Sequence, residues 1–174
     1  MINPKEIESA IRNVPDFPKP GIQFKDITPV LADPKLFAGT IELLINNFKP
    51  GSVDAVVGID ARGFIFAAAA AMKLQAGFVP VRKKGKLPYQ TIEEDYALEY
   101  GHATVAIHTD ALKPGAHVLL VDDLLATGGT AAAATALVKK LGAEILQAGF
   151  LIELKFLNGR EKLKGLPVRS LVVY

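Results

Sequence analysis

The residues with the clearest chemical potential lie between Val118 and Thr130, in the stretch VLLVDDLLATGGT. Four apolar residues predict a buried strand, and two neighbouring carboxylates, Asp122 and Asp123, follow them. Glycines and threonines come next, and an alanine-rich segment with helical spacing comes after those. The order of strand, acidic pair, small loop and helix predicts a single site formed by a loop and the start of a helix.

The loop Ala126–Thr130 has the composition of a phosphate-binding loop. Its glycines, Gly128 and Gly129, leave the backbone bare, so that several N–H groups approach one anion at the positive end of the following helix dipole. The hydroxyls of Thr127 and Thr130 are further donors. The acidic pair would repel a phosphate, but carboxylates accept hydrogen bonds well from sugar hydroxyls. The pattern therefore indicates a site for a phosphorylated sugar, and the plain alternative is a strand-to-helix turn with two capping aspartates.

The same stretch resembles the phosphoribosyl pyrophosphate (PRPP) motif of the type I phosphoribosyltransferases. That motif has four hydrophobic residues, two acidic residues and a short loop rich in threonine and glycine, and every position from Val118 to Thr130 agrees with it. The chain contains neither the Gly-Lys-Ser/Thr triplet of a Walker loop nor the GxGxxG fingerprint of dinucleotide-binding folds. Both of those nucleotide sites are therefore excluded.

The composition is that of one globular domain with a full apolar core. Half of the 174 residues are hydrophobic, the formal net charge is +2 and the pI is about 8.8. This charge is too small to indicate a nucleic-acid partner. The absence of cysteine excludes disulfides and thiol catalysis, and the three histidines are too far apart to predict a metal site. No signal peptide precedes the first helix and no apolar run is long enough for a bilayer, so we expect a cytoplasmic protein without a membrane partner.

The apolar pattern predicts an α/β fold. Residues 3–14 begin with a capping sequence, Asn-Pro-Lys-Glu, and continue at helical spacing, and residues 33–48 predict a second helix. Strands and helices then alternate in chain order: strand 55–59, helix 64–74, strand 78–81, a hairpin with strands 98–100 and 104–108, strand 117–121, helix 131–141, and strands 145–153 and 168–173. This alternation predicts a mostly parallel, twisted sheet flanked by helices, with ligands at the carboxyl ends of the strands.

Two further segments place charge at predicted strand ends. In the turn Gly58–Gly63, the forked guanidinium of Arg62 and the amides near Ala61 would suit a pyrophosphate, although an ordinary turn with a solvated arginine explains this sequence equally well. The segment after Val81 has four positive charges in five residues. It opens a connection of about fifteen residues, a length typical of a lid. A basic lid suits a substrate with several phosphates, whereas most charge runs are solvated surface.

The order of motifs along the whole chain is similar to that of the adenine phosphoribosyltransferase family. VPVRKKGKLP, a lid, LEYG and VDDLLATGGT follow one another, and the end segments FPKPGIQFKDITPVL and ELKFLNGREKL look like the same family. The resemblance implies a single phosphoribosyltransferase domain over 1–174, with a small amino-terminal hood that binds the base at 1–33 and a lid and hairpin at 82–108. It also implies transfer of the 5-phosphoribosyl group from PRPP to adenine, which gives AMP and pyrophosphate in purine salvage.

The resemblance assigns roles to particular residues. We expect Glu99, in LEYG, to move in with the lid and to act as the catalytic residue near the reacting ribose. The expected binding residues are Ala126, Thr127, Gly128, Gly129 and Thr130 for the 5′-phosphate, Asp122 and Asp123 for the ribose, Ala61, Arg62 and Lys83 for the pyrophosphate, and Gln23, Phe24, Lys25 and Leu157 for adenine. The ring of Phe24 would stack on the base. Family members often have arginine after this phenylalanine, so the departure to Lys25 puts a side-chain contact with the base in question.

The resemblance also implies a cofactor and a partner chain. We expect Mg²⁺ to be held mainly by oxygens of the substrate, with no direct protein site, and we expect a homodimer. Three alternatives stay open: a phosphoribosyltransferase for hypoxanthine, guanine or xanthine, a non-catalytic PRPP-binding regulatory protein, and a plain sugar-phosphate-binding module. A regulator that binds DNA would need a further domain, for which we expect no room before the base-binding segment.

Overall fold

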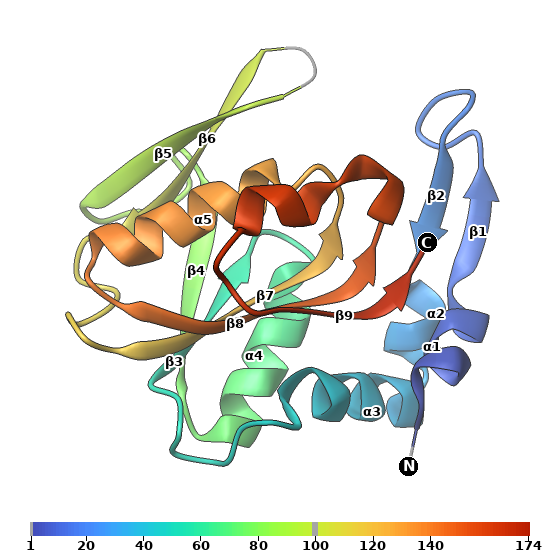
Figure 1. Ribbon diagram of the computed structural model, residues 1–174, viewed down its shortest axis with the longest axis horizontal. Coiled ribbons are helices and arrows are strands. Elements are labelled where there is room, and N and C mark those ends of the chain that lie inside the picture. The colour runs from blue at the N-terminus through green and yellow to red at the C-terminus, as the bar shows by residue number, and fades with distance from the viewer. Residues whose placement is uncertain (1, 99–100) are drawn as a thin grey trace. The chain divides into compact units, whose positions relative to one another are not determined.

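The structure is a computed structural model that describes residues 2–98 and 101–174 (Figure 1). The chain divides into two compact units, Met1–Leu43 and Leu44–Tyr174. Short helices and a hairpin form the smaller unit, and the larger unit contains the sheet expected from the alternating pattern. The single domain with a hood at 1–33 stays a prediction.

The first helix of the smaller unit is shorter than its sequence pattern predicts. Helix α1 spans Pro4–Ala10 and begins with the expected capping box. Asn3 Oδ1 accepts hydrogen bonds from the N–H groups of Lys5 and Glu6 at 2.9 and 3.2 Å, and Glu6 Oε2 accepts one from Asn3 N–H at 2.8 Å. The prediction of helix as far as residue 14 is wrong, because the backbone becomes extended at Ile11.

A hairpin follows this helix where the sequence analysis expected a helix end and a loop. Strand β1, Arg12–Pro15, pairs antiparallel with strand β2, Gln23–Asp26. The proline at the end of β1 disfavours helical backbone in the residue before it, and the pairing with β2 satisfies the extended backbone instead. Helices α2 and α3 come next, at Thr28–Ala32 and Pro34–Ile45.

The larger unit is organised around a seven-stranded sheet with the order β5-β6-β4-β3-β7-β8-β9. The strands are β3 (Ala55–Ile59), β4 (Gly77–Lys83), β5 (Thr91–Ala97), β6 (His102–His108), β7 (His117–Leu125), β8 (Glu144–Glu153) and β9 (Val168–Val173). Strand β6 pairs antiparallel with β4 and β5, and all the other neighbouring pairs are parallel. The prediction of a mostly parallel sheet is confirmed.

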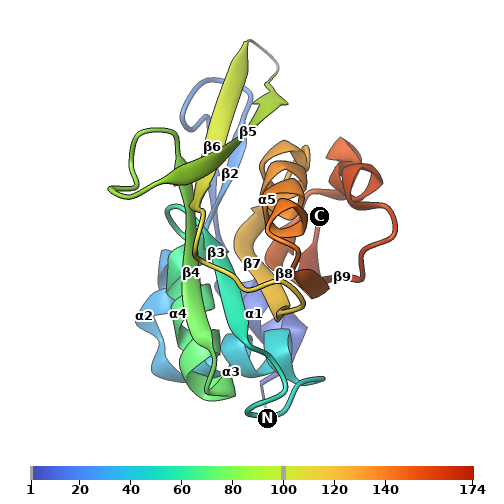
Figure 2. The same cartoon turned by 90° about the vertical axis from the view of Figure 1, so that its left-hand side faces the viewer.

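Helices α4 and α5 cover the two faces of this sheet (Figure 2). Helix α4, Gly63–Leu74, packs on β3, β4 and β7, and helix α5, Gly129–Lys140, packs on β5, β6 and β8. Alternate residues of β3 point to the two helices: Gly58 lies against Ala67 of α4, whereas Val57 belongs to the core on the side of α5. Burial on both faces explains why β3 is apolar at every position.

The antiparallel hairpin beside β4 begins earlier than predicted. Its first strand, β5, lies where we expected an open connection, and Leu98 already follows the strand. The three acidic residues of β5 all have partners: Glu93 with Lys84 at 2.7 Å, Glu94 with Lys140 at 2.5 Å, and Asp95 with the hydroxyl of Thr104 at 2.6 Å. These contacts offset the low strand propensity of acidic residues, which is why the sequence pattern concealed the strand.

Candidate active site

Two adjacent carboxylates lie near the carboxyl end of β7. The predicted strand ends at Val121, but β7 continues to Leu125, so that Asp122 and Asp123 belong to the strand and not to the loop after it. The extension arises because β7 stays paired with β8, with Asp122 opposite Phe150. Asp122 is partly buried and Asp123 is buried. Both side chains are therefore held by the sheet.

Arg62 is the ionic partner of Asp123. Arg62 lies in the turn between β3 and α4, and β3 is the parallel neighbour of β7. Its Nε atom is 2.5 Å from Asp123 Oδ2. The side chain of Arg62 is 47% exposed and that of Asp123 is 11% exposed, so a ligand reaches the arginine more easily than the aspartate. The structure thus joins two predicted site residues that are 61 positions apart in the chain.

The environment of Asp122 differs from that of Asp123. A Cβ atom at Gly63 would lie 2.6 Å from Asp122 Oδ1 and 3.1 Å from the Val121 carbonyl oxygen, so the backbone of α4 closes directly on this carboxyl. Burial and then the charge of Asp123 raise the pKa of Asp122 well above its usual range, and a hydrogen bond from Asp123 N–H to Asp122 Oδ1 (2.8 Å) opposes the rise. The two aspartates therefore differ: Asp123 is bound to the Arg62 guanidinium, whereas Asp122 has a raised pKa and so keeps its proton to higher pH than an ordinary carboxyl.

The loop after β7 surrounds a small pocket of about 80 Å³, lined by Asp122, Leu124, Leu125 and residues 126–131. Helix α5 begins two residues earlier than predicted, so Gly129 and Thr130 lie in its first turn. Gly128 has a φ of +79°, a left-handed conformation that favours glycine. In the part of the chain that the structure describes, the N–H groups of Thr127 and Gly128 donate to no other residue, and a first helical turn leaves more donors open. The pocket thus offers hydrogen-bond donors to an anion.

The basic segment that begins at the end of β4 is joined to the turn after β3 through Arg82, which lies in the strand. Arg82 Nε is 2.7 Å from Asp60 Oδ2, and Arg82 Nη1 donates to the Lys86 carbonyl oxygen at 3.1 Å. Lys83, one of the predicted pyrophosphate-binding residues, is the exposed last residue of β4. The sequence analysis treated Arg82 only as part of a charge run. It missed the pair with Asp60, because contacts between neighbouring strand ends leave no signal in residue spacing.

The predicted adenine-binding residues lie on two separate elements. Gln23, Phe24 and Lys25 form part of β2 in the smaller unit, and Leu157 lies in a 3₁₀ turn of the larger unit, η1, at Lys155–Leu157. The ring of Phe24 contacts the ring of Phe17 edge-on, with centroids 5.0 Å apart, and Phe17 is 50% exposed. The smaller unit thus presents an aromatic surface, of which Phe17 is a member that the sequence analysis missed.

The predicted catalytic residue, Glu99, lies outside the described residues. Strand β5, which precedes it in the chain, is described and contacts helix α5. A Cβ atom at Gly129 would lie 2.9 Å from Tyr96 Cδ2, so the ring of Tyr96 rests against the first turn of α5. This contact between β5 and α5 also has no signal in the sequence.

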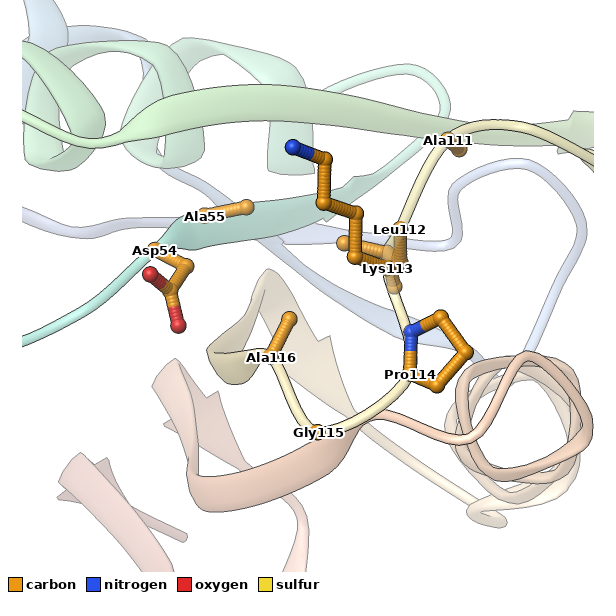
Figure 3. Close-up of a pocket in the computed structure, with 8 residues that line it drawn as sticks. All are labelled: Asp54, Ala55, Ala111, Leu112, Lys113, Pro114, Gly115 and Ala116. Atoms are coloured by element: carbon orange, nitrogen blue, oxygen red, sulfur yellow. The ribbon is translucent and has the colours of Figure 1, made fainter.

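A larger cavity, of about 470 Å³, lies at the opposite ends of the central strands (Figure 3). Its lining residues are Asp54, Ala55, Leu112 and their neighbours in the connection 111–116. Asp54 and Lys113 are the charged residues that line it, and the carboxylate of Asp54 accepts a hydrogen bond from His117 N–H at 2.7 Å. Ligands of open parallel sheets lie at the carboxyl ends of the strands. We therefore place the candidate site at the smaller pocket, where the open donors are.

Comparison with known proteins identifies the family. Residues 27–166 match the phosphoribosyl transferase domain. The chain is 57% identical to an adenine phosphoribosyltransferase from Acidothermus cellulolyticus, over 95% of this chain and 94% of that protein. The chain belongs to the adenine phosphoribosyltransferase family.

Solved structures of adenine phosphoribosyltransferases have the same fold. The structure from Thermoanaerobacter pseudethanolicus matches with a TM-score of 0.94 at 49% identity, covering 99% of this chain and 100% of that one. The Saccharomyces cerevisiae structure, complexed with adenine and an imino-altritol bisphosphate, matches with a TM-score of 0.91 at 42% identity and covers 97% of each chain. The predicted type I phosphoribosyltransferase fold is therefore confirmed.

The described residues of this adenine phosphoribosyltransferase family member include neither a membrane-spanning helix nor a cluster of metal ligands. None of the helices within residues 2–98 and 101–174 has both the length and the apolar character needed to cross a membrane. The same residues contain no group of three or more His, Cys, Asp and Glu side chains arranged to hold a metal ion.

Proposed function

We propose that the protein transfers the 5-phosphoribosyl group of PRPP to adenine, forming AMP and pyrophosphate as a purine-salvage enzyme. The observation that carries this proposal is the junction at the carboxyl ends of β3 and β7. There the ion pair between Arg62 and Asp123 lies beside Asp122, which also lines the pocket of the phosphate loop. Donors for phosphate, acceptors for sugar hydroxyls and a cation for a leaving anion thus occupy one edge of the sheet. Membership of the family supports adenine as the base.

The phosphate loop and the acidic pair would hold the sugar. We assign the 5′-phosphate to the loop Ala126–Thr130, where open N–H groups and the positive end of α5 favour an anion. We assign the ribose hydroxyls to Asp122 and Asp123, whose oxygens accept hydrogen bonds. Ribose binding would therefore compete with Arg62 for Asp123.

The turn after β3 and the end of β4 would hold the leaving group. We assign the pyrophosphate to Ala61, Arg62 and Lys83, and the contact between Arg82 and Asp60 supports the turn that presents Arg62. A guanidinium binds phosphate oxygens in a forked geometry, whereas a lysine contributes a point charge. Release of Arg62 from Asp123 would let each side chain bind its own part of PRPP.

The aromatic surface of the smaller unit supports the assignment of the base. We assign adenine to Gln23, Phe24, Lys25 and Leu157, with the ring of Phe24 stacked on the purine. Asn13 Nδ2 donates a hydrogen bond to Gln23 Oε1 at 2.9 Å. We propose that the backbone around Gln23 and Lys25 recognises the edge of the base.

The reaction forms one bond and breaks one. A nitrogen of adenine bonds to the anomeric carbon while the bond from that carbon to the pyrophosphate oxygen breaks, and the electron pair leaves with pyrophosphate. The hydrogen that this nitrogen carries in neutral adenine is lost as a proton, so the products are AMP, pyrophosphate and H⁺. Positive charge builds on the ribose ring at the transition state, close to the assigned carboxylates. Catalysis would then depend on positioning the two substrates and on stabilising this charge.

The donor set fits a magnesium ion that the substrate largely holds. Mg²⁺ in proteins is commonly bound by one or two carboxylates together with phosphate oxygens, and Asp122 and Asp123 are the carboxylates beside the pocket. One of them is paired with Arg62 and the other has a raised pKa, so neither is a strong ligand by itself. When bound, the ion would neutralise charge on the leaving pyrophosphate.

Glu99 is proposed as the catalytic residue on the basis of the family resemblance. Replacement by leucine, Glu99→Leu, is expected to lower kcat by about tenfold while changing KM less, because the carboxylate would act on the reacting ribose and not on substrate affinity. Steady-state kinetics with both substrates measure this split, and Glu8→Leu on the exposed face of α1 is the control. An unchanged kcat would remove Glu99 from the mechanism.

The oligomeric state and compartment are proposed from the same resemblance. We propose a homodimer that acts in the cytoplasm. Light scattering coupled to size-exclusion chromatography tests the first point, and a monomer at working concentration would overturn it.

A base panel tests the proposed reaction. The protein is mixed with PRPP, Mg²⁺ and each of adenine, hypoxanthine, guanine and xanthine, and nucleoside monophosphate is measured. We expect AMP as the main product, because the chain belongs to the adenine phosphoribosyltransferase family. The panel separates the bases because adenine has an amino group where the other three have a carbonyl. Preferential turnover of another base would favour the alternative transferases. PRPP binding without product would favour the regulatory or sugar-phosphate-binding alternatives.

A further inference from the structure

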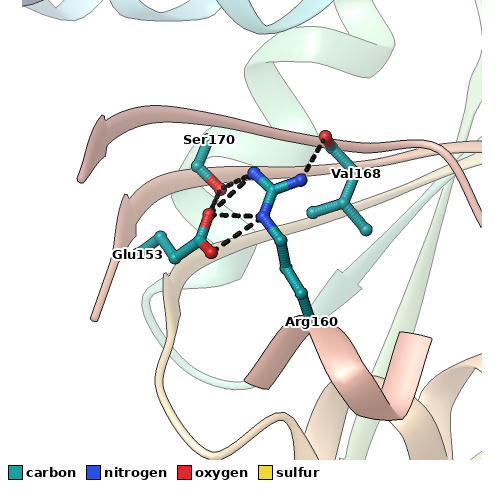
Figure 4. A network of polar contacts seen from close by, with 4 residues as sticks. All are labelled: Glu153, Arg160, Val168 and Ser170. Carbon is teal, nitrogen blue, oxygen red and sulfur yellow. Dashed lines mark hydrogen bonds and ion pairs between the residues drawn. The ribbon is translucent and has the colours of Figure 1, made fainter. Parts of the chain in front are cut away.

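A polar network that the reaction above does not use anchors the segment between β8 and β9 (Figure 4). Glu153, the last residue of β8, is 4% exposed, and Arg160 lies in the 3₁₀ turn η2, Gly159–Leu163. Arg160 Nε donates to both carboxylate oxygens of Glu153, at 2.8 and 2.9 Å, and Arg160 Nη2 is 2.7 Å from Oε2. Two contacts to β9 complete the network: Nη1 donates to the Val168 carbonyl oxygen at 3.0 Å, and Nη2 donates to Ser170 Oγ at 3.3 Å.

This network holds the Arg160 side chain in a single orientation. The hydrogen bonds from Arg160 lower the pKa of Glu153 despite its burial, and a further hydrogen bond from Ser170 Oγ (2.6 Å) acts in the same direction. The carboxylate therefore stays charged at neutral pH. A planar guanidinium reaches both carboxylate oxygens and the β9 acceptors at once, and a lysine at the same position would reach fewer of them.

Gly159, next to Arg160 in the chain, touches the phosphate loop through its backbone. A Cβ atom on Gly159 would lie 2.3 Å from the Ala126 carbonyl oxygen and 3.1 Å from the Gly128 nitrogen. A Cβ atom on Gly128 would in turn lie 2.3 Å from the Gly159 carbonyl oxygen. No side chain fits between these two backbones, so a displacement of η2 is transmitted directly to the loop.

We propose that Arg160 is a positioning residue for the phosphate loop and acts through Gly159. The ion pair with Glu153 fixes η2 on the ends of β8 and β9, and η2 holds the backbone of Gly159 against Ala126 and Gly128. That contact supports the left-handed conformation at Gly128, and with it the shape of the loop residues that line the pocket. The proposal rests on the proposed function, since it takes this loop to bind the 5′-phosphate.

Isothermal titration calorimetry with two separate ligands tests the proposal. Ribose 5-phosphate probes the phosphate loop, and inorganic pyrophosphate probes the turn at Arg62. For Gly159→Ala and for Arg160→Lys, we expect the Kd of ribose 5-phosphate to rise by about tenfold or more, because small displacements of binding groups have large effects. The Kd of pyrophosphate should stay within about twofold of its original value. A general loss of structure would weaken both ligands, so the split between them separates positioning from stability.

Two control variants come from the same segment. Gly165→Ala places an alanine at a φ of +83° with no atom within 4 Å of the new Cβ, so it introduces backbone strain without touching the loop. Lys164→Ala breaks an exposed ion pair with Glu161, which has an N–O distance of 2.7 Å. Both controls should bind ribose 5-phosphate as the original protein does.

The possible outcomes separate the positioning role of Arg160 from the proposed function of the protein. If the original protein binds ribose 5-phosphate and both test variants bind it equally well, the positioning role of Arg160 is overturned and the proposed function stands. Equal weakening of both ligands also overturns it. If the original protein binds neither PRPP nor ribose 5-phosphate, the proposed function fails and the positioning role fails with it. Gly159→Ala changes neither the Glu153 nor the Arg160 side chain, so it still tests the contact between η2 and the loop if Arg160→Lys does not fold.

Discussion

The Asp122→Asn variant is expected to be more stable at neutral pH than the original protein, by about 1–3 kcal/mol in the free energy of unfolding. Burial and the charge of Asp123 raise the pKa of Asp122, so the folded state has to hold a poorly solvated charge once this carboxyl ionises. Asparagine keeps an oxygen that accepts the hydrogen bond from Asp123 N–H, and it carries no charge. The same change should weaken PRPP binding if Asp122 binds the ribose.

The pH dependence of this stability difference follows from the direction of the pKa shift. An acid with a raised pKa in the folded state contributes stability below its unfolded pKa, and this contribution is lost as the pH rises through the folded value. The advantage of the variant should therefore be largest at the highest pH tested and should shrink as the pH falls. Urea unfolding at several pH values measures it, with Asp110→Asn as the exposed control. A variant that is less stable at pH 8 would contradict the raised pKa.

The Asp123→Asn variant is expected to bind PRPP about 5- to 150-fold more weakly, the range that corresponds to a loss of roughly 1–3 kcal/mol. The carboxylate is proposed to accept hydrogen bonds from the ribose hydroxyls, and the amide has one acceptor oxygen fewer. A second effect acts in the opposite direction. Arg62 is no longer bound to a carboxylate at 2.5 Å, so its release toward pyrophosphate costs less. The measured weakening is the difference between these two effects.

Separate titrations resolve the two effects in Asp123→Asn. Ribose 5-phosphate should bind more weakly to the variant, and pyrophosphate should bind as well as before or better. Calorimetry with each ligand measures both, and Asp110→Asn again controls for the loss of one negative charge. Unchanged affinity for ribose 5-phosphate would show that Asp123 does not bind the sugar.

The parts of the fold that the sequence predicts best are those with burial on two faces. Strand β3 and the first half of β7 are apolar runs bounded by charged or glycine-rich turns, and their predicted starts agree with the structure. Strand β5 was missed because its acidic residues find their ion-pair and hydrogen-bond partners outside the strand, such as Lys140 of α5 and Thr104 of β6. The end of β7 was missed for a related reason, because pairing with β8 extends the strand through two charged residues.

The residue types and spacing of the candidate site were readable from the chain alone. A glycine-threonine loop after two aspartates is a local pattern, since all of its parts are neighbours in the sequence. The pair of Arg62 with Asp123 is of another kind, because it forms only when β3 and β7 lie side by side in parallel. Nothing in either segment indicates that the two side chains would bind each other.

The sequence by itself thus determined the residue types of the loop Ala126–Thr130 and of the acidic pair, and the alternating α/β order, because each depends on residues close together in the chain. Only the tertiary structure decided which charges pair, which carboxyl has a raised pKa and which backbone lies against the loop. Gly159 and Gly128 illustrate the difference. A Cβ atom on either residue would collide with the backbone beside the other, and this closeness arises only because η2 packs against the loop. Electrostatic energies and steric limits depend on distance in space, and spacing in sequence does not report that distance.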